Sequence, residues 1–300
     1  MCKRYAPSAL LTIPGAGIYA LLPGRKPRET SALKEGDPIK ITAYGKTDRG
    51  KVRAKNEDDL ALVDLDASRG IEPPSVERLS VNGRGLLLAV CDGVGGRRAG
   101  EVASALALHC LPEEMQALGS VCPNADLFRT AVENVGRRVW QESKLDPVLE
   151  GMTTTLTAAV ICQSRAVVAH VGDSRAYVLR DGKMRQITRD HSFVAEMVES
   201  GALTPEEAER SPYRNVILQA VGQKKKLEVA LDAVDLRPGD MLILCTDGLS
   251  EKVSPDEMAR VVQSAEPRQA AEALVKLANE RGGEDNITVL IAKVEGGDAK

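Results

Sequence analysis

The sequence has 300 residues, of which 43% are hydrophobic and 28% are charged, and its 40 basic and 43 acidic residues leave a net charge of −3. This composition is typical of a globular chain that is long enough to bury a sizeable core. The near balance of charge excludes the strongly basic surface that would attract a polyanion such as nucleic acid.

The first 38 residues differ in composition from the rest of the chain. They contain five prolines, and basic residues flank the apolar stretch ALLTIPGAGIYALL. A proline and two glycines interrupt this stretch, which is too short to span a bilayer. We therefore expect residues 1–38 to form a flexible N-terminal extension rather than an export signal, and we expect a cytoplasmic protein.

The six cysteines show no C-x-x-C pair and no regular spacing. Two of them interrupt apolar runs, as buried thiols do. This pattern predicts reduced core thiols rather than a disulfide framework or a metal site. The cysteines are Cys2, Cys91, Cys110, Cys122, Cys162 and Cys245.

From residue 39 onward, short apolar runs alternate with longer helical patterns. The apolar runs predict strands at residues 39–46, 60–65, 86–91, 155–162, 165–171, 175–180, 227–235, 241–246 and 286–294. Asp181-Gly182 is the favoured two-residue signal for a hairpin. The helical patterns predict helices at residues 98–118, 125–144, 255–263 and 267–281.

Two segments between these elements have their own composition. Residues 66–85 are polar and contain prolines, and they predict a loop. Residues 192–222 predict two short helices, because Gly201 can end one helix and Thr204 can cap the next. Strands that meet in hairpins, with helices added in pairs, predict an α+β layered sandwich rather than a doubly wound parallel sheet.

Acidic residues stand where several predicted strands end. LLLAVCDGVGG places Asp92 directly after an apolar strand, and MLILCTDGL repeats this pattern with Asp247. Further acids occupy comparable positions: Asp173, Asp285, Glu57, Asp58 and Asp59. Each one alone could be a turn or cap residue, but together they would repel one another unless cations lay between them. Hard oxygen ligands without a histidine cluster favour magnesium or manganese over zinc.

The glycine-rich turn after Asp92 does not match two common phosphate-binding motifs. A dinucleotide fingerprint that starts at Gly93 would need glycine where Arg98 stands, and a P-loop that starts at Gly95 would need lysine where Glu101 stands. We interpret the glycines as residues that bring the backbone, through the Gly93 carbonyl, close to a cation.

Seven segments, in order, resemble the metal-dependent protein serine/threonine phosphatases of type 2C, in the bacterial branch. They are TDRGKVRAKNED, AVCDGVGG, GMTTTLTAAVI, VGDSRAYVLRDGKMRQITRDHS, RNVILQAVG, LCTDGLSEKVS and GGEDNITVLIAKV. The resemblance covers residues 39–295. It implies a catalytic domain over 39–295 with a mobile flap at 192–222 and a tail at 296–300. The implied fold is a four-layer α-β-β-α sandwich, with two antiparallel sheets flanked by helix pairs.

The resemblance also implies a centre of two manganese or magnesium ions with a weaker third. Asp92 would bridge two ions, the Gly93 carbonyl and Glu57, through waters, would complete one site, and Asp247 and Asp285 would hold the other. Asp173 matches the acid of the third site, and Asp58 matches an acid that holds metal waters. Arg53 matches the arginine that grips the substrate phosphate, as a planar fork of donors should.

The implied chemistry is direct attack on phosphorus by a water that bridges the two cations. A cysteine nucleophile is not expected, because Asp92 beside Cys91 would disfavour its thiolate. Many eukaryotic members have a histidine, their proposed general acid, where Val94 stands. Because valine cannot donate a proton, we expect water at the metals to protonate the leaving group. We expect His191 to be a core histidine, and Thr153, which replaces a glycine of the family, to be a local packing change.

The leading hypothesis is a phosphatase that acts on phosphoserine and phosphothreonine in proteins and opposes a bacterial serine/threonine kinase. It would work as a monomer, with no nucleic-acid or membrane partner. Two alternatives stay open: a weak or inactive phosphatase fold that binds a regulatory partner, and a hydrolase of small phosphoesters. The first alternative is disfavoured because Asp92, Asp247 and Asp285 are all present.

Overall fold

Two antiparallel sheets form the centre of the fold in the computed structural model, which describes residues 39–67, 69–70, 77–81, 83–94, 99–119, 122 and 124–295. The predicted extension 1–38 and tail 296–300 lie outside these residues. In the described chain the first sheet has the strand order β10 (Lys183–Gln186), β9 (Arg175–Arg180), β12 (Met241–Cys245), β13 (Ile287–Val294), β1 (Ile39–Asp48) and β4 (Glu77–Val81).

The second sheet has the order β11 (Ala230–Asp235), β8 (Arg165–Val171), β7 (Leu156–Cys162), β5 (Leu86–Val94), β2 (Asp58–Asp64) and β3 (Arg69–Gly70). The short strand β6 (Thr153–Thr154) pairs with the end of β5. Neighbouring strands of β5 run antiparallel to it, as the hairpin pattern of the sequence predicts.

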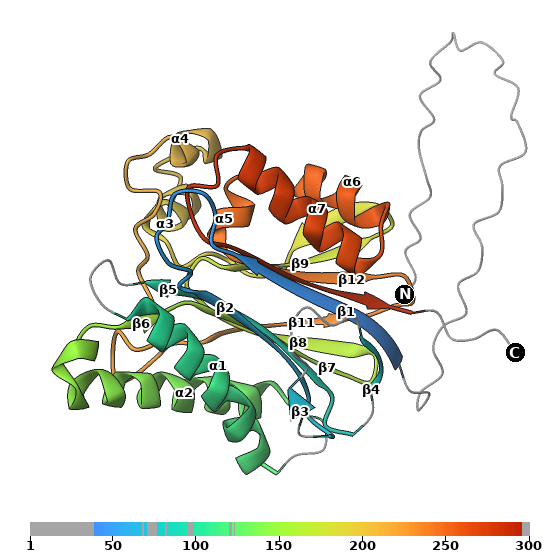
Figure 1. Cartoon of the computed structure of the whole chain (residues 1–300), viewed down its shortest axis with the longest axis horizontal. Helices are drawn as coiled ribbons and strands as arrows, with labels where there is room; N and C mark the ends of the chain where they lie inside the picture. The colour runs from blue at the N-terminus through green and yellow to red at the C-terminus, as the bar shows by residue number, and fades with distance from the viewer. Residues whose placement is uncertain are drawn as a thin grey trace, which may run out of the picture. The chain divides into compact units, whose positions relative to one another are not determined.

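Helices cover the outer face of each sheet (Figure 1). The helices α1 (Gly100–Ala117) and α2 (Ala125–Leu145) pack on the sheet that contains β5, and the 3₁₀ turn Pro147–Leu149 follows α2. The helices α5 (Asp247–Ser250), α6 (Pro255–Gln263) and α7 (Pro267–Glu280) pack on the sheet that contains β13. The short helices α3 (Phe193–Glu199) and α4 (Pro205–Glu209) belong to the segment 192–222.

Alternation along the strands divides the core into three apolar clusters. Along β5, Leu86, Leu88 and Val90 belong to the cluster between the two sheets, whereas the alternate residues belong to the cluster beneath α1 and α2. A third cluster lies between the β13 sheet and α7. Successive side chains of a strand point to opposite faces, so both faces of each sheet are buried. The predicted four-layer α-β-β-α sandwich is confirmed.

The prediction that residues 66–85 form only a loop is wrong. Within this stretch β3 pairs with β2, and β4 pairs with β1 over residues that run from Ile39 to Ala43. Both strands are short and lie at sheet edges. A short edge strand gains its hydrogen bonds from a partner distant in sequence, so a polar composition does not prevent it from forming.

The expectation that all cysteines are reduced is also corrected. Cys122 and Cys162 form a disulfide that joins the segment before α2 to the end of β7. Cys91, Cys110 and Cys245 are buried free thiols, as predicted, and Cys2 lies outside the described residues. The pairing could not be predicted from spacing, because the two residues are 40 positions apart in the sequence.

Reduction of the Cys122–Cys162 disulfide is expected to lower the free energy of unfolding by about 4 kcal/mol, because the bridge restricts the unfolded chain. Urea unfolding with and without a phosphine reductant measures this difference. The variant Cys122→Ser is the control, since the reductant should leave its unfolding midpoint unchanged. An unchanged midpoint for the parent, after thiol titration has shown the bridge to be present beforehand, would contradict the prediction.

Candidate metal centre

Asp58 and Asp92 lie side by side where the cluster between the sheets ends. They are register partners at the beginning of β2 and near the end of β5. Asp58 and Asp92 continue the rows of alternate residues that face the space between the sheets, since Leu60 and Val90 belong to that cluster. The strand pattern therefore places two carboxylates at one edge of the sandwich.

The opposite sheet holds Asp58 through two threonine hydroxyls. Its Oδ2 accepts a hydrogen bond of 2.8 Å from Thr246 Oγ1 and one of 2.7 Å from Thr288 Oγ1. Thr246 directly precedes Asp247, so the same contact also fixes Asp247 relative to Asp58. Two such hydrogen bonds fix the orientation of the Asp58 carboxyl.

The backbone of Asp92 is fixed by the neighbouring threonines. Its N–H donates to Thr155 Oγ1 at 2.9 Å, and its carbonyl accepts from Thr154 Oγ1 at 2.8 Å. Thr155 Oγ1 also bonds Ser174 Oγ at 2.7 Å, next to Asp173. Buried hydroxyls thus connect the strand end that carries Asp92 to the loop that carries Asp173.

Burial and mutual repulsion raise the pKa values of these acids strongly. Burial raises the pKa of Asp58 to about 8, and the charges of Asp247 and Asp285 add to this rise against the lowering effect of the threonine hydrogen bonds. Burial, then Asp247, raises the pKa of Asp173 to about 8. Burial, then Asp58, raises the pKa of Asp92 well above its usual value. A bound cation would offset the unfavourable negative charge of such buried carboxylates.

Asp247 adds a fourth acid to this group. Burial, then the charge of Asp285, raises its pKa to about 6, and a hydrogen bond with Asp92 partly offsets the rise. The structure therefore brings Asp58, Asp92, Asp173 and Asp247 together from both sheets, as the sequence predicted.

The carboxylate oxygens of this group are the type of ligand that binds a hard divalent cation. Asp58 Oδ1, Asp173 Oδ1 and Asp247 Oδ1 are buried without a hydrogen-bond partner in the described chain. Unpaired buried carboxylate oxygens are costly, and they are the ligands that magnesium and manganese prefer.

The acidic side chains do not converge on a single point in the described residues. Over the described ranges, no group of three or more His, Cys, Asp or Glu side chains has the spacing of a metal site. Both oxygens of Asp285 have other partners. Its Oδ2 accepts from Arg53 Nη2 at 2.7 Å, and its Oδ1 accepts from the N–H of Asn286 at 2.8 Å. Asp285 thus lies at the edge of the acid group and contacts Arg53.

Gly93 lies where three backbone segments meet. Its N–H donates to the Glu57 carbonyl at 3.1 Å, and a Cβ at this position would lie 2.4 Å from the Gly100 carbonyl oxygen. Only glycine fits this close approach. Glu57 lies beside this contact, and burial, followed by the charge of Glu101, raises its pKa. Gly93 and Glu57 are therefore adjacent.

Contacts near both ends of the segment 192–222 connect it to the candidate centre. Val221 forms a β-bridge with Thr154, whose hydroxyl contacts Asp92. Just before the other end, the backbone carbonyl of His191 accepts from the Leu218 N–H at 2.8 Å, and the backbone N–H of His191 donates to the Gly172 carbonyl at 2.6 Å. The His191 ring also packs against the buried His170 with ring centroids 4.8 Å apart. These contacts indicate a structural role for His191, but the residue is half-buried and not in the core as expected.

Cys91 precedes Asp92, and Thr153 pairs with Val94 across β5 and β6. Burial raises the pKa of Cys91 well above its usual value, which disfavours a thiolate nucleophile. Thr153, at a position where the family has glycine, donates from its hydroxyl to the Val94 carbonyl at 2.7 Å. The substitution therefore adds a hydrogen bond across the β5–β6 pair.

Several polar residues around the acids were not singled out from the sequence. They are Thr155, Ser174, Thr246, Asn286, Thr288 and Glu101. Glu101 accepts from Lys55 Nζ at 2.5 Å and is the largest charged influence on Glu57. Thr246 and Asn286 adjoin predicted acids in the sequence, and this adjacency is the one local signal that could have identified them.

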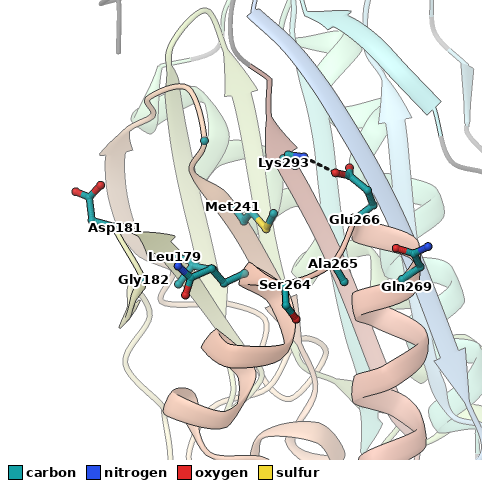
Figure 2. Close-up of a pocket in the computed structure, with 11 residues that line it drawn as sticks. Leu179, Asp181, Gly182, Met241, Ser264, Ala265, Glu266, Gln269 and Lys293 are labelled. Carbon is teal, nitrogen blue, oxygen red and sulfur yellow. Dashed lines mark hydrogen bonds and ion pairs between the residues drawn. The ribbon is translucent and has the colours of Figure 1, made fainter. Parts of the chain in front are cut away.

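A separate cavity of about 500 Å³ lies at the other end of β12 from Asp247 (Figure 2). Leu179 and Met241 line it, and the ion pair between Lys293 and Glu266 borders it. None of the predicted site residues lines it.

In the described part of the chain, no helix combines the length and the hydropathy that crossing a bilayer requires.

Comparison with known proteins agrees with this arrangement. The profile of the family Protein phosphatase 2C matches residues 77–279. The serine/threonine phosphatase stp of Listeria monocytogenes is 35% identical over 254 residues, which are 83% of this chain and 94% of that protein. The crystal structure of the Mycobacterium tuberculosis serine/threonine phosphatase PstP is 36% identical, covers 86% of this chain and 99% of its own, and has a TM-score of 0.72.

A structure of the catalytic domain of PstP in complex with two manganese ions is 35% identical to this chain, with a TM-score of 0.70 and coverage of 86% of this chain and 99% of that one. The likeness in sequence and the likeness in fold each extend over more than four fifths of the chain. The chain belongs to the protein phosphatase 2C family, in the bacterial branch of its serine/threonine phosphatases.

Proposed function

We propose that this chain removes phosphate from phosphoserine and phosphothreonine in proteins, with two manganese or magnesium ions and a weaker third. The observation that carries the proposal is the group of buried, mutually repelling carboxylates with unpartnered oxygens. Their position at one edge of the sandwich of a protein phosphatase 2C member supports it. The relative whose structure contains two manganese ions favours manganese as the first metal to test.

The proposed ligands come from both sheets. Asp92 would serve both ions, with the Gly93 carbonyl and Glu57 on one side and Asp247 and Asp285 on the other. Asp173 would bind the third ion, and Asp58 would hold waters at the metals. The free Oδ1 atoms of Asp58, Asp173 and Asp247 support these roles, because each is buried without a partner in the described residues.

Bound divalent cations would supply a nucleophilic water of lowered pKa and would neutralise charge on the phosphoryl oxygens. Arg53 would orient the phosphate, because its guanidinium is half-exposed, with 51% of the side chain accessible, and lies against Asp285. Val94 offers no proton to the leaving alkoxide, so that proton must come from elsewhere in the site.

Other parts of the proposal concern the surroundings of the site. We assign the catalytic domain to residues 39–295, with the flap at 192–222. Phosphoproteins are the substrates, and a bacterial serine/threonine kinase would supply them. We further propose a cytoplasmic monomer without a nucleic-acid or membrane partner. The exposed run Lys224-Lys225-Lys226 is a solvated loop on this view.

The purified protein is expected to hydrolyse a phosphothreonine peptide with manganese and to lose this activity when a chelator is in excess, with recovery when manganese is restored. Phosphate release measures the rate. No activity with manganese would overturn the proposal and favour a binding protein with a phosphatase fold. Comparable kcat/KM for nucleotides and for phosphopeptides would instead favour a hydrolase of small phosphoesters.

A further inference from the structure

The segment that carries Arg53 has little structure of its own. Residues 49–57 connect β1 to β2 without helix or strand, and most of them are exposed. A loop of this kind would sample many conformations and would lose much of its value for orienting a phosphate. Contacts from outside the loop must therefore hold Arg53 in place.

Those contacts come mainly from one short segment before β13. The Gly283 carbonyl accepts from the N–H of Lys51 at 2.7 Å and of Val52 at 3.3 Å. Asp285 accepts from the Arg53 guanidinium. We propose that the next residue, Asn286, is the positioning residue that fixes the Arg53 loop relative to the metal ligands.

Asn286 contacts the loop on both sides of Arg53. Its Nδ2 donates to the Arg49 carbonyl and to the Lys55 carbonyl, each at 2.9 Å. Its Oδ1 accepts from the Glu57 N–H at 2.8 Å. Both amide hydrogens are used, and the residue is 5% exposed. One side chain thus closes the loop from its first residue to its last.

The backbone of Asn286 completes the connection. Its N–H donates to Asp285 Oδ1, whose other oxygen contacts Arg53. Asn286 therefore lies between a proposed metal ligand and the proposed phosphate-binding arginine. A side chain in this place couples the position of the phosphate group to that of the ions, through Arg53 and without touching either.

The inference rests on the proposed function, and a double-variant cycle separates it from a general structural role. Asn286→Ala is expected to raise the KM for a phosphothreonine peptide and the inhibition constant of inorganic phosphate about tenfold, because three hydrogen bonds to the loop are lost. Arg53→Ala is expected to raise both constants as well. In the Arg53→Ala background, Asn286→Ala should change them by less than about twofold, because Asn286 acts through Arg53.

Hydrogen exchange of the chelated protein provides a readout that needs no activity. Asn286→Ala should speed the exchange of amides in residues 49–57, while the backbone N–H of residue 286 still reaches Asp285. The matched control is Asn134→Ala, since Asn134 lies on α2 and its Nδ2 donates to Glu114 Oε2 at 2.9 Å. This control should leave phosphate inhibition and loop exchange unchanged. If Asn286→Ala does not fold, Asn286→Asp keeps the acceptor for Glu57 and loses both donors, and it should show the same changes.

Two results would overturn the inference. One is equal effects of Asn286→Ala in the parent and Arg53→Ala backgrounds, which would indicate a role independent of Arg53. The other is parent-like loop exchange in a folded Asn286 variant. A parent protein without manganese-dependent activity would sink the proposed function instead, and loop exchange would still test the contact between Asn286 and the loop.

Discussion

Replacement of Asp92 by asparagine is expected to lower manganese-dependent hydrolysis of a phosphothreonine peptide by at least about a thousandfold. The same change should raise the melting temperature of the chelated protein at pH 8. Asparagine keeps the shape of the side chain but removes a carboxyl whose ionised form burial and the neighbouring acids Asp58 and Asp247 make unfavourable, so the folded chain need neither bury that charge nor hold the proton that neutralises it. Activity and metal-free stability should therefore move in opposite directions.

Phosphate release and thermal unfolding in the presence of a chelator measure the two effects. Asp247→Asn should behave in the same way, since repulsion from Asp285 contributes to its raised pKa. The matched control is Asp181→Asn in the exposed β9–β10 turn, which should change neither quantity. Undiminished activity in Asp92→Asn, or a chelated variant less stable than the parent, would contradict this account of Asp92.

The strand ends and their acids could be predicted because each depends on local pattern. Asp92 follows a run of apolar residues whose alternate members face the space between the sheets, so its position at the edge of the sandwich follows from strand periodicity. The resemblance then assigned the acids to one centre, and the structure brings Asp58, Asp92, Asp173 and Asp247 into mutual electrostatic contact. Their metal roles stay predictions.

The contacts that hold the acids could not be predicted, because they join residues distant in sequence. Asp58 is 188 positions from Thr246, and Arg49 is 237 positions from Asn286. A threonine or an asparagine next to a strand end has many ordinary uses, and only the packing of distant segments selects this one. The strand β4 and the Cys122–Cys162 bridge were missed for the same reason.

The free energy of unfolding of the chelated protein is expected to fall by about 3 kcal/mol between pH 6.5 and pH 8. Burial raises the pKa of Asp58 and of Asp173 to about 8, whereas carboxyls of an unfolded chain titrate near pH 4, about four units lower. The folded protein thus holds protons that the unfolded chain has released, and stability falls as pH rises until the folded pKa is passed.

Below pH 6.5, His170 changes the free energy of unfolding in the opposite direction, so the measurement starts at pH 6.5. Burial lowers the pKa of His170 to about 3, so its contribution rises with pH only up to the unfolded value near 6.5. Above about pH 6.5 the aspartates dominate. Manganese binds the ionised carboxylates, so the stabilisation by manganese should grow over the same window.

Urea unfolding at pH 6.5, 7.2 and 8, with chelator and with manganese, measures both trends. Asp58→Asn should flatten the fall with pH in chelator, because one of the carboxyls that titrate in this window is gone, whereas Asp181→Asn should leave it unchanged. A chelated protein whose stability rises between pH 6.5 and pH 8 would show that these carboxyls are already ionised without metal. Repulsion within the acid group would then not be the reason that the site needs cations.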